Sequence, residues 1–402
     1  MEKSEEVIKK IRSKADECLE SQIDLLTEFA SFDSETNCIE GNARAVELAK
    51  KHLDVLSPVY EEISFDGVGT HLLAKINTKA ASKGRIILNA HLDTVFPVGF
   101  AEKHLPHREG DKLYGLGTID CKGGVAVSCY AVRILKELGL LPDIEIDILY
   151  TCDEEQGSQT GQSVYERVAP GADAAFVFEP GYKSDGVIPI ITSRQGVILG
   201  NLDITGREAH AGCDYSKGRS ATKELAYKIL ELYSLNDEKR GIYCNAAPVS
   251  GGRPNGVVSG SANLQFCVAG IPDNDAYNEY EKKLDKLGEK SVDPDCTLDM
   301  SYRMLFPPQL HTEKVGEIYK TVEKAAGLLN LKTTEDGVNK NGEDVYAATD
   351  ANYIAAFGVP VLVGFGPLGG GMHTTDEFVY IPSIAEKTSL FAAYLYLLSI
   401  NK

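Results

Sequence analysis

A short apolar run over residues 85–90 constrains the fold more than any other stretch of this chain. The run reads Arg-Ile-Ile-Leu-Asn-Ala and is typical of a strand buried on both faces, as in a parallel sheet. His91 and Asp93 follow it directly. Because residues two apart in a strand point the same way, the imidazole and the carboxylate are predicted to lie side by side. A carboxylate placed in this way can fix the tautomer and orientation of a metal-bound histidine.

Strands and helices alternate through the first half of the chain, which indicates a parallel sheet covered by helices. Most of the histidine and acidic residues of interest follow the ends of strands, and open α/β sheets bind their ligands at that edge. The expected elements are helices at 4–31 (one interrupted helix or a pair), 42–56, 125–138 and 163–168, and strands at 72–76, 85–90, 144–150 and 174–178.

The order of elements changes near residue 193. Strands expected at 197–204, 242–249, 262–268 and 296–304, with helices at 221–233 and 275–287, follow the order β-α-β-β-α-β of a ferredoxin-like domain. We expect the second of these helices to stop at Gly288. The alternation then resumes with helices at 313–329, 347–357 and 382–399 and a strand at 359–365.

These patterns predict an α/β protein with two domains. A split catalytic domain, residues 1–192 and 307–402, would hold a mostly parallel sheet flanked by helices. Residues 193–306 would form an inserted ferredoxin-like α+β domain.

Composition restricts the partners and the location. The net charge of −18 disfavours nucleic acids and anionic membrane surfaces, which attract basic proteins. No stretch approaches the ~20 apolar residues of a membrane span, and the first residues, Met-Glu-Lys-Ser-Glu-Glu, lack the apolar segment of a signal peptide. The nine cysteines show no CxxC spacing, so reduced thiols and a cytoplasmic location are expected.

Histidine and acidic residues form the candidate metal site. Imidazole and carboxylate donors without thiolate suit a hydrolytic divalent ion better than a structural cysteine site. Each residue alone has an ordinary explanation, such as a turn aspartate or a solvated Glu-Glu pair, but their collection at one sheet edge favours a shared function. The candidates are His91, Asp120, Glu154, Glu155, Glu179 and His373.

Seven short motifs occur in order between residues 85 and 376. They are His91-Leu-Asp93-Thr-Val, Gly115-x-Gly-x-x-Asp120-x-Lys-Gly-Gly124, Asp153-Glu-Glu155-x-Gly-Ser158, Phe178-Glu179-Pro180, Gly206-x-x-Ala-His210-Ala-Gly212, Thr349-Asp350-Ala351 and Gly371-Met-His373. With this set the chain resembles the di-zinc amidohydrolases and exopeptidases that include bacterial glutamate carboxypeptidase, acetylornithine deacetylase and succinyl-diaminopimelate desuccinylase. Glu179 and its Phe-Glu-Pro context are most similar to the glutamate carboxypeptidase branch.

The resemblance implies a pair of Zn²⁺ ions, with Co²⁺ or Mn²⁺ as alternatives. His91, Asp120 and Glu179 would hold one ion. Asp120, Glu155 and His373 would hold the other, with Asp120 bridging the two. The peptide bond after Asp120 would be cis, as it is in the family.

The resemblance also implies catalytic roles for three further residues. Glu154 would be the general base, which takes a proton from the attacking water and returns it to the leaving amine. Asp93 would orient His91. His210, from the inserted domain, would stabilise the tetrahedral oxyanion across a dimer interface, so the insertion would serve as a lid and dimerisation domain of a homodimer.

The implied reaction is hydrolysis of an amide or peptide bond to an amino acid with a free α-carboxylate, in a small peptide or an N-acyl amino acid. A glutamate-carboxypeptidase-like peptidase is the first expectation, and an N-acyl-amino-acid deacylase is the alternative among enzymes. A catalytically inactive metal-binding relative is the alternative outside enzymes. Retention of the general base Glu154 argues against an inactive relative, because a binding protein would not need a base.

Two positions depart from the family pattern. Cys121 follows the bridging aspartate where relatives often have methionine, and we expect little consequence from this change. Relatives end the strand at 262–268 with Asp-Val-Arg, whose arginine binds the substrate carboxylate, whereas this chain continues Val-Ala-Gly. Arg303 and Asn255 become the candidate substrate contacts, and Gly370 could supply a backbone N–H that only glycine lets approach closely.

Overall fold

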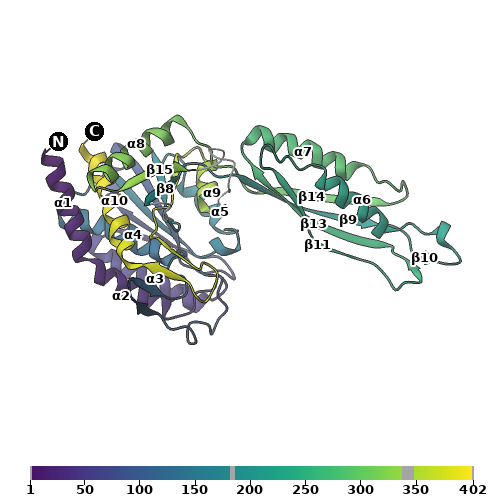
Figure 1. Ribbon diagram of the computed structural model, residues 1–402, viewed down its shortest axis with the longest axis horizontal. Coiled ribbons are helices and arrows are strands. Elements are labelled where there is room, and N and C mark those ends of the chain that lie inside the picture. The colour runs from purple at the N-terminus through teal and green to yellow at the C-terminus, as the bar shows by residue number, and fades with distance from the viewer. Residues whose placement is uncertain (1, 182–185, 337–347, 401–402) are drawn as a thin grey trace. The chain divides into compact units, whose positions relative to one another are not determined.

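The computed structural model describes residues 2–181, 186–336 and 348–400. These residues divide into two compact units. The first unit takes the residues up to Ser193 and most of those from His311 onward, and the second unit is Arg194–Leu310. Figure 1 shows both units in the colours of the chain order.

The first unit is built on an eight-stranded sheet. β6 pairs parallel with β3, β3 with β7, β7 with β16, and β8 with β15, while the β1–β2, β2–β6 and β16–β8 pairs are antiparallel. In sheet order the strands are β1 (Val59–Ile63), β2 (His71–Ile76), β6 (Glu145–Thr151), β3 (Arg85–His91), β7 (Ala174–Val177), β16 (Val361–Val363), β8 (Val187–Ile191) and β15 (Lys332–Asp336).

Helices surround this sheet and bury their apolar faces against it. α10 is the extreme case, because most of its side chains are buried, and it packs against α1, α4 and α8. None of the helices in the described ranges is both long and apolar enough to cross a bilayer. The helices of this unit are α1 (Glu2–Glu17), α2 (Leu19–Ala30), α3 (Ile39–Leu53), α4 (Lys122–Glu137), α5 (Gly161–Val168), α8 (Glu313–Leu328), α9 (Asp350–Ala356) and α10 (Ile381–Ile400).

A small four-stranded sheet also belongs to the first unit. Its strands are β17 (Gly369–Gly370), β18 (Phe378–Tyr380), β5 (Lys112–Tyr114) and β4 (His107–Glu109), in that order. The loop between β17 and β18 contains His373. These strands are not predicted from the sequence, because two or three residues are too few to show a period of two.

The second unit is an antiparallel sheet with helices on one face. Its sheet order is β11-β13-β9-β14, and α6 and α7 share an apolar core with these strands along that face (Figure 1). A short pair, β10 (Ala209–His210) and β12 (Val257–Val258), lies outside the main sheet. The main elements are β9 (Gly196–Thr205), α6 (Ala221–Tyr233), β11 (Tyr243–Gly251), β13 (Ser261–Ile271), α7 (Asn274–Glu289) and β14 (Thr297–Phe306).

The fold confirms the predicted α/β class, with its mostly parallel sheet and its β-α-β-β-α-β insertion. Several details were wrong. α7 continues through Gly288 instead of ending there, and α4 begins at Lys122, three residues earlier than predicted. The strands β1, β8 and β15 were not predicted. Part of the helix expected at 347–357 lies outside the described residues, and its described part begins at Asp350.

Candidate metal centre

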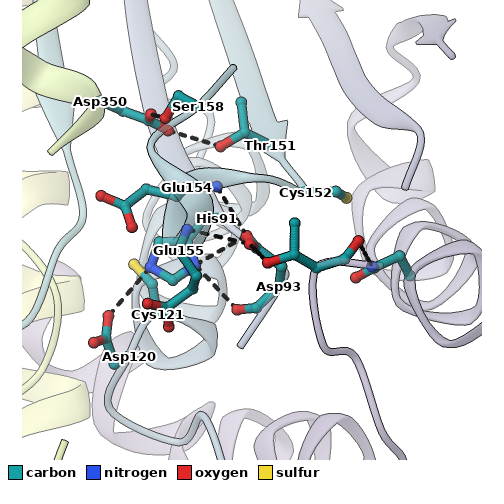
Figure 2. A network of polar contacts seen from close by, with 12 residues as sticks. His91, Asp93, Asp120, Cys121, Thr151, Cys152, Glu154, Glu155, Ser158 and Asp350 are labelled. Carbon is teal, nitrogen blue, oxygen red and sulfur yellow. Dashed lines mark hydrogen bonds and ion pairs between the residues drawn. The ribbon is translucent and has the colours of Figure 1, made fainter. Parts of the chain in front are cut away.

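His91 is the last residue of β3 and is buried at the carboxyl edge of the large sheet. Its Nε2 lies 3.1 Å from Oδ1 of Asp120 and 3.9 Å from Oε1 of Glu179. Its Nδ1 lies 3.1 Å from the backbone oxygen of Asp93 and 3.4 Å from the Asp93 carboxylate. Nδ1 therefore faces Asp93, which leaves Nε2 directed at the acidic residues (Figure 2).

Asp120 joins two histidines through its two carboxylate oxygens. Oδ1 faces His91, as above, and Oδ2 lies 3.2 Å from Nε2 of His373. Burial opposes ionisation of Asp120, but hydrogen bonds from His373 and His91 outweigh burial and lower its pKa below the ordinary value. The Asp120–Cys121 peptide bond is cis, which confirms the prediction.

Glu154 and Glu155 form a short 3₁₀ turn, Glu154–Gln156, directly after β6. Oε2 of Glu155 lies 3.3 Å from Nε2 of His373, and burial raises the pKa of Glu155 to about 7. Within the described ranges the Glu154 carboxylate forms no ion pair. Burial, followed by the charge of Glu179, raises the pKa of Glu154 well above its ordinary value. The two neighbours therefore differ, since only Glu155 contacts a histidine.

Asp93 connects His91 to this turn. Its carboxylate accepts hydrogen bonds from the backbone N–H groups of Glu154, at 3.3 Å, and Glu155, at 3.2 Å. It also accepts a 2.7 Å bond from the Thr36 hydroxyl. One buried carboxylate thus fixes the end of β3 against the turn after β6.

Glu377 is a residue that the sequence analysis missed. It is buried, and its carboxylate accepts hydrogen bonds from the backbone N–H groups of Gly117 (2.9 Å), Ile119 (2.8 Å) and Asp120 (3.0 Å). Burial, opposed by these three bonds, raises the pKa of Glu377 to about 7. Glu377 therefore holds the loop that presents Asp120. Its position four residues after His373 was the one sequence feature that placed it near the site. A single glutamate outside any motif gives no further indication of a role.

Asp350 is a second buried support. It belongs to the Thr349-Asp350-Ala351 motif, whose sequence alone predicts no role for it. Its carboxylate accepts hydrogen bonds from the hydroxyls of Ser158 and, at 2.8 Å, Thr151 (Figure 2). Asp350 opens α9, so this network ties α9 to the segment around Glu154 and Glu155.

His210 and Asn255 lie close to each other in the second unit. β10, which ends at His210, pairs with β12, which begins two residues after Asn255. The backbone N–H groups of Gly212 and Cys213 each donate to Nδ1 of His210 at 3.1 Å. Nδ1 is therefore the acceptor, and a neutral His210 ring carries its proton on Nε2.

Arg303 lies elsewhere on the same unit. It pairs with Leu199 on β9, six residues along the strand from the Thr297–Thr205 pair near the β10 end. At 3.3 Å per residue this corresponds to a separation of about 20 Å. Gly370 belongs to the first unit, in β17. The structure thus groups His210 with Asn255 but does not group Arg303 with them.

The donor set of the first unit fits divalent cations. Ligand atoms of His91, Asp120 and Glu155 all lie within 4.8 Å of one another, as do those of His91, Cys121 and Glu179. Carboxylates crowded in a buried site raise one another's pKa unless positive charge compensates them. Both clusters contain the imidazole and carboxylate donors of hydrolytic metal sites.

Comparisons with known proteins agree with this geometry. The model of peptidase family M20/M25/M40 matches residues 87–397. Carboxypeptidase G2 from Pseudomonas sp. (strain RS-16) is 27% identical over 383 residues, which cover 94% of this chain and 90% of that protein.

Solved structures show the same fold. Aminopeptidase PepT from Bacillus cereus matches with a TM-score of 0.76 at 22% identity and covers 96% of this chain and 99% of its own. An M20 family metallo-carboxypeptidase from Sulfolobus solfataricus matches with a TM-score of 0.72 at 18% identity, covering 94% and 99%. The chain therefore belongs to the M20/M25/M40 peptidase family and is a hydrolytic enzyme of the metallopeptidase class.

Proposed function

We propose that the protein is a dinuclear, zinc-dependent hydrolase that releases an amino acid with a free α-carboxylate from a small peptide or N-acyl amino acid. The observation that carries this proposal is the Asp120 carboxylate, whose two oxygens face His91 and His373 at 3.1 and 3.2 Å. One carboxylate between two imidazoles suits two ions that share a bridging ligand. Glu179 would complete the first position and Glu155 the second, with Co²⁺ or Mn²⁺ as alternative metals.

Bound divalent ions would polarise the scissile carbonyl and lower the pKa of the attacking water. Glu154 would accept a proton from that water and then donate it to the leaving amine. The His210 ring, whose Nδ1 accepts two backbone hydrogen bonds, would donate a hydrogen bond from Nε2 to the developing oxyanion. Asp93 would keep Nε2 of His91 directed at the metal position.

The adjacent residues Glu154 and Glu155 provide a matched pair of variants. Glu154→Gln should retain wild-type metal content but lose turnover by about 10²- to 10⁴-fold or more, because the base is gone and the ligands remain. Glu155→Gln should lose metal as well as activity. The measurements are metal content after dialysis and hydrolysis of a panel of dipeptides and N-acyl amino acids, which also separates the peptidase from the deacylase.

The assignment of Glu154 as base is wrong if Glu154→Gln keeps most of the wild-type activity. Equal loss of metal in the two variants would mean that both residues are ligands. Either result would leave the fold and the family unchanged.

Arg303 is the proposed anchor for the substrate α-carboxylate, with the backbone of Gly370 assisting. Asn255 lies beside His210 and not beside Arg303, so it would assist from the second copy of the chain, as His210 would. Arginine binds carboxylates through two parallel hydrogen bonds. Arg303 lines a hollow on the second unit's sheet together with Leu199, Asn201, Gln265 and Ser301. Its separation from His210 is compatible with this role, because His210 would serve the partner subunit's centre.

Replacing Arg303 with alanine tests this anchor. A lost charge-assisted hydrogen bond costs about 1.5–3 kcal/mol, so kcat/KM should fall about 10- to 150-fold. The loss should shrink for a substrate whose α-carboxylate is converted to an amide. Arg253→Ala is the matched control, because Arg253 pairs with Glu208 at 2.9 Å and should not discriminate between acid and amide. An equal loss on both substrates in Arg303→Ala would reject the anchor.

A two-fold homodimer formed through the second unit is the proposed assembly. β11 is an edge strand, and α6 packs beside it. Large apolar side chains on these two elements are exposed, which supports burial against a second copy. They are Tyr227 (43%), Leu230 (69%), Tyr233 (40%), Tyr243 (50%) and Val249 (48%).

Co-expression of two inactive variants tests the assembly and the action of His210 in trans. Neither Glu154→Gln nor His210→Ala should be active alone. A mixed dimer restores one centre, which draws Glu154 from one subunit and His210 from the other, so random pairing should recover about a quarter of wild-type activity.

Adding Leu230→Asp to both chains should abolish this recovery and give monomers in sedimentation. Leu105→Asp, at a similarly exposed leucine (63%) of the first unit, should change neither the recovered activity nor the sedimentation of the dimer. A fully active monomer would contradict the dimer, and dimers without recovered activity would contradict action in trans.

The remaining features support a small-molecule substrate in a reducing compartment. All nine cysteines are free in the structure. The net charge of −18 disfavours nucleic acids and anionic membranes as partners. We infer a cytoplasmic location from these features.

A further inference from the structure

Cys121 lies inside the candidate metal centre, although little consequence is expected from its sequence position alone. It is fully buried at the start of α4. Its Sγ lies within 4.8 Å of the ligand atoms of both His91 and Glu179, which themselves lie within that distance of each other. Figure 2 shows the sulfur next to the His91 ring.

We propose that Cys121 is a further metal ligand, which binds as a thiolate to the ion held by His91 and Glu179. This proposal rests on the dinuclear function proposed above. Zn–S bonds of about 2.3 Å and Zn–N bonds of about 2.0–2.1 Å bring donors that share one ion to roughly 3.5 Å from each other. The three donors, which now lie within 4.8 Å of one another, would therefore need to approach by no more than about 1.3 Å to close on an ion.

The Cys121 thiol would exchange a hydrogen bond for a bond to the metal. Its sulfur now donates to the backbone oxygen of Phe178 at 3.1 Å, and Phe178 directly precedes Glu179. On metal binding the S–H bond breaks, the metal–sulfur bond forms, and the proton leaves to solvent. The carbonyl of Phe178 loses one hydrogen bond in return.

Other buried thiols of the chain have different neighbours. Cys129 donates to the backbone oxygen of His52 and Cys152 to that of Thr70. Within the described part of the chain, Cys121 is the cysteine that joins a group of candidate ligands. Burial alone therefore does not account for its position beside His91 and Glu179.

A thiolate changes the metal preference of the position that it joins. Soft sulfur ligands favour Zn²⁺, whereas carboxylate and carbonyl ligands suit Mn²⁺. The position formed by His91, Asp120, Glu179 and Cys121 would thus select Zn²⁺ over Mn²⁺ more strongly than the position formed by Asp120, Glu155 and His373.

Cobalt substitution tests the proposal by a readout other than activity. Metal-free wild-type protein is loaded with Co²⁺, and the near-ultraviolet spectrum is recorded for a thiolate-to-cobalt charge-transfer band. We expect the band in the wild type and in Cys129→Ala, a matched buried thiol on the same helix. We expect no band in Cys121→Ser or Cys121→Ala, and a weaker preference for Zn²⁺ over Mn²⁺ than in the wild type.

X-ray absorption at the zinc edge of the wild-type protein needs no variant and should show a sulfur neighbour at about 2.3 Å. If the protein binds two Co²⁺ ions and hydrolyses substrate normally but shows no charge-transfer band, Cys121 is not a ligand and the proposed function stands. A zinc-edge spectrum without a sulfur neighbour would lead to the same conclusion. A band that persists in Cys121→Ser would also overturn the role of Cys121. A wild-type protein that binds no Co²⁺ and Zn²⁺ at all would overturn both proposals.

Discussion

The contact between Asp120 and two histidines is the interaction on which the site depends. Each oxygen of this one carboxylate faces a different imidazole, and the two histidines come from segments 282 residues apart, at positions 91 and 373. This partly buried carboxylate stays ionised because the hydrogen bonds from both rings lower its pKa more than burial raises it. Displacing Asp120, His91 or His373 would separate the two groups of ligands that Asp120 connects.

Other buried carboxylates hold the segments around Asp120 in place by accepting hydrogen bonds. Glu377 accepts hydrogen bonds from three backbone N–H groups of the loop that contains Asp120. Asp93 accepts hydrogen bonds from two backbone N–H groups of the turn that contains Glu155. Asp350 ties α9 to the same region through Ser158 and Thr151. Buried groups of this kind orient the residues that contact a metal, and their loss commonly weakens metal affinity by about 10- to 100-fold.

The sequence was informative wherever a feature is periodic or belongs to an ordered set of motifs. The apolar run at 85–90 and the alternation of strands with helices predicted the parallel sheet, and the motif set indicated the family. Features that depend on tertiary contacts carried no such signal. Glu377 is one glutamate among many, and β17 and β18 are too short to show periodicity. The position of the Cys121 thiol depends on how the start of α4 packs against Phe178, which spacing cannot show.

The central claim is that two metal ions, held by the residues around Asp120, carry out the hydrolysis. The most direct measurement is a titration of metal-free protein with Zn²⁺, with bound metal and hydrolysis of an N-acyl amino acid or dipeptide recorded at each addition. The account predicts no activity without metal and a maximum at two ions per chain. Full activity in the metal-free protein, or a maximum at one ion per chain, would contradict it.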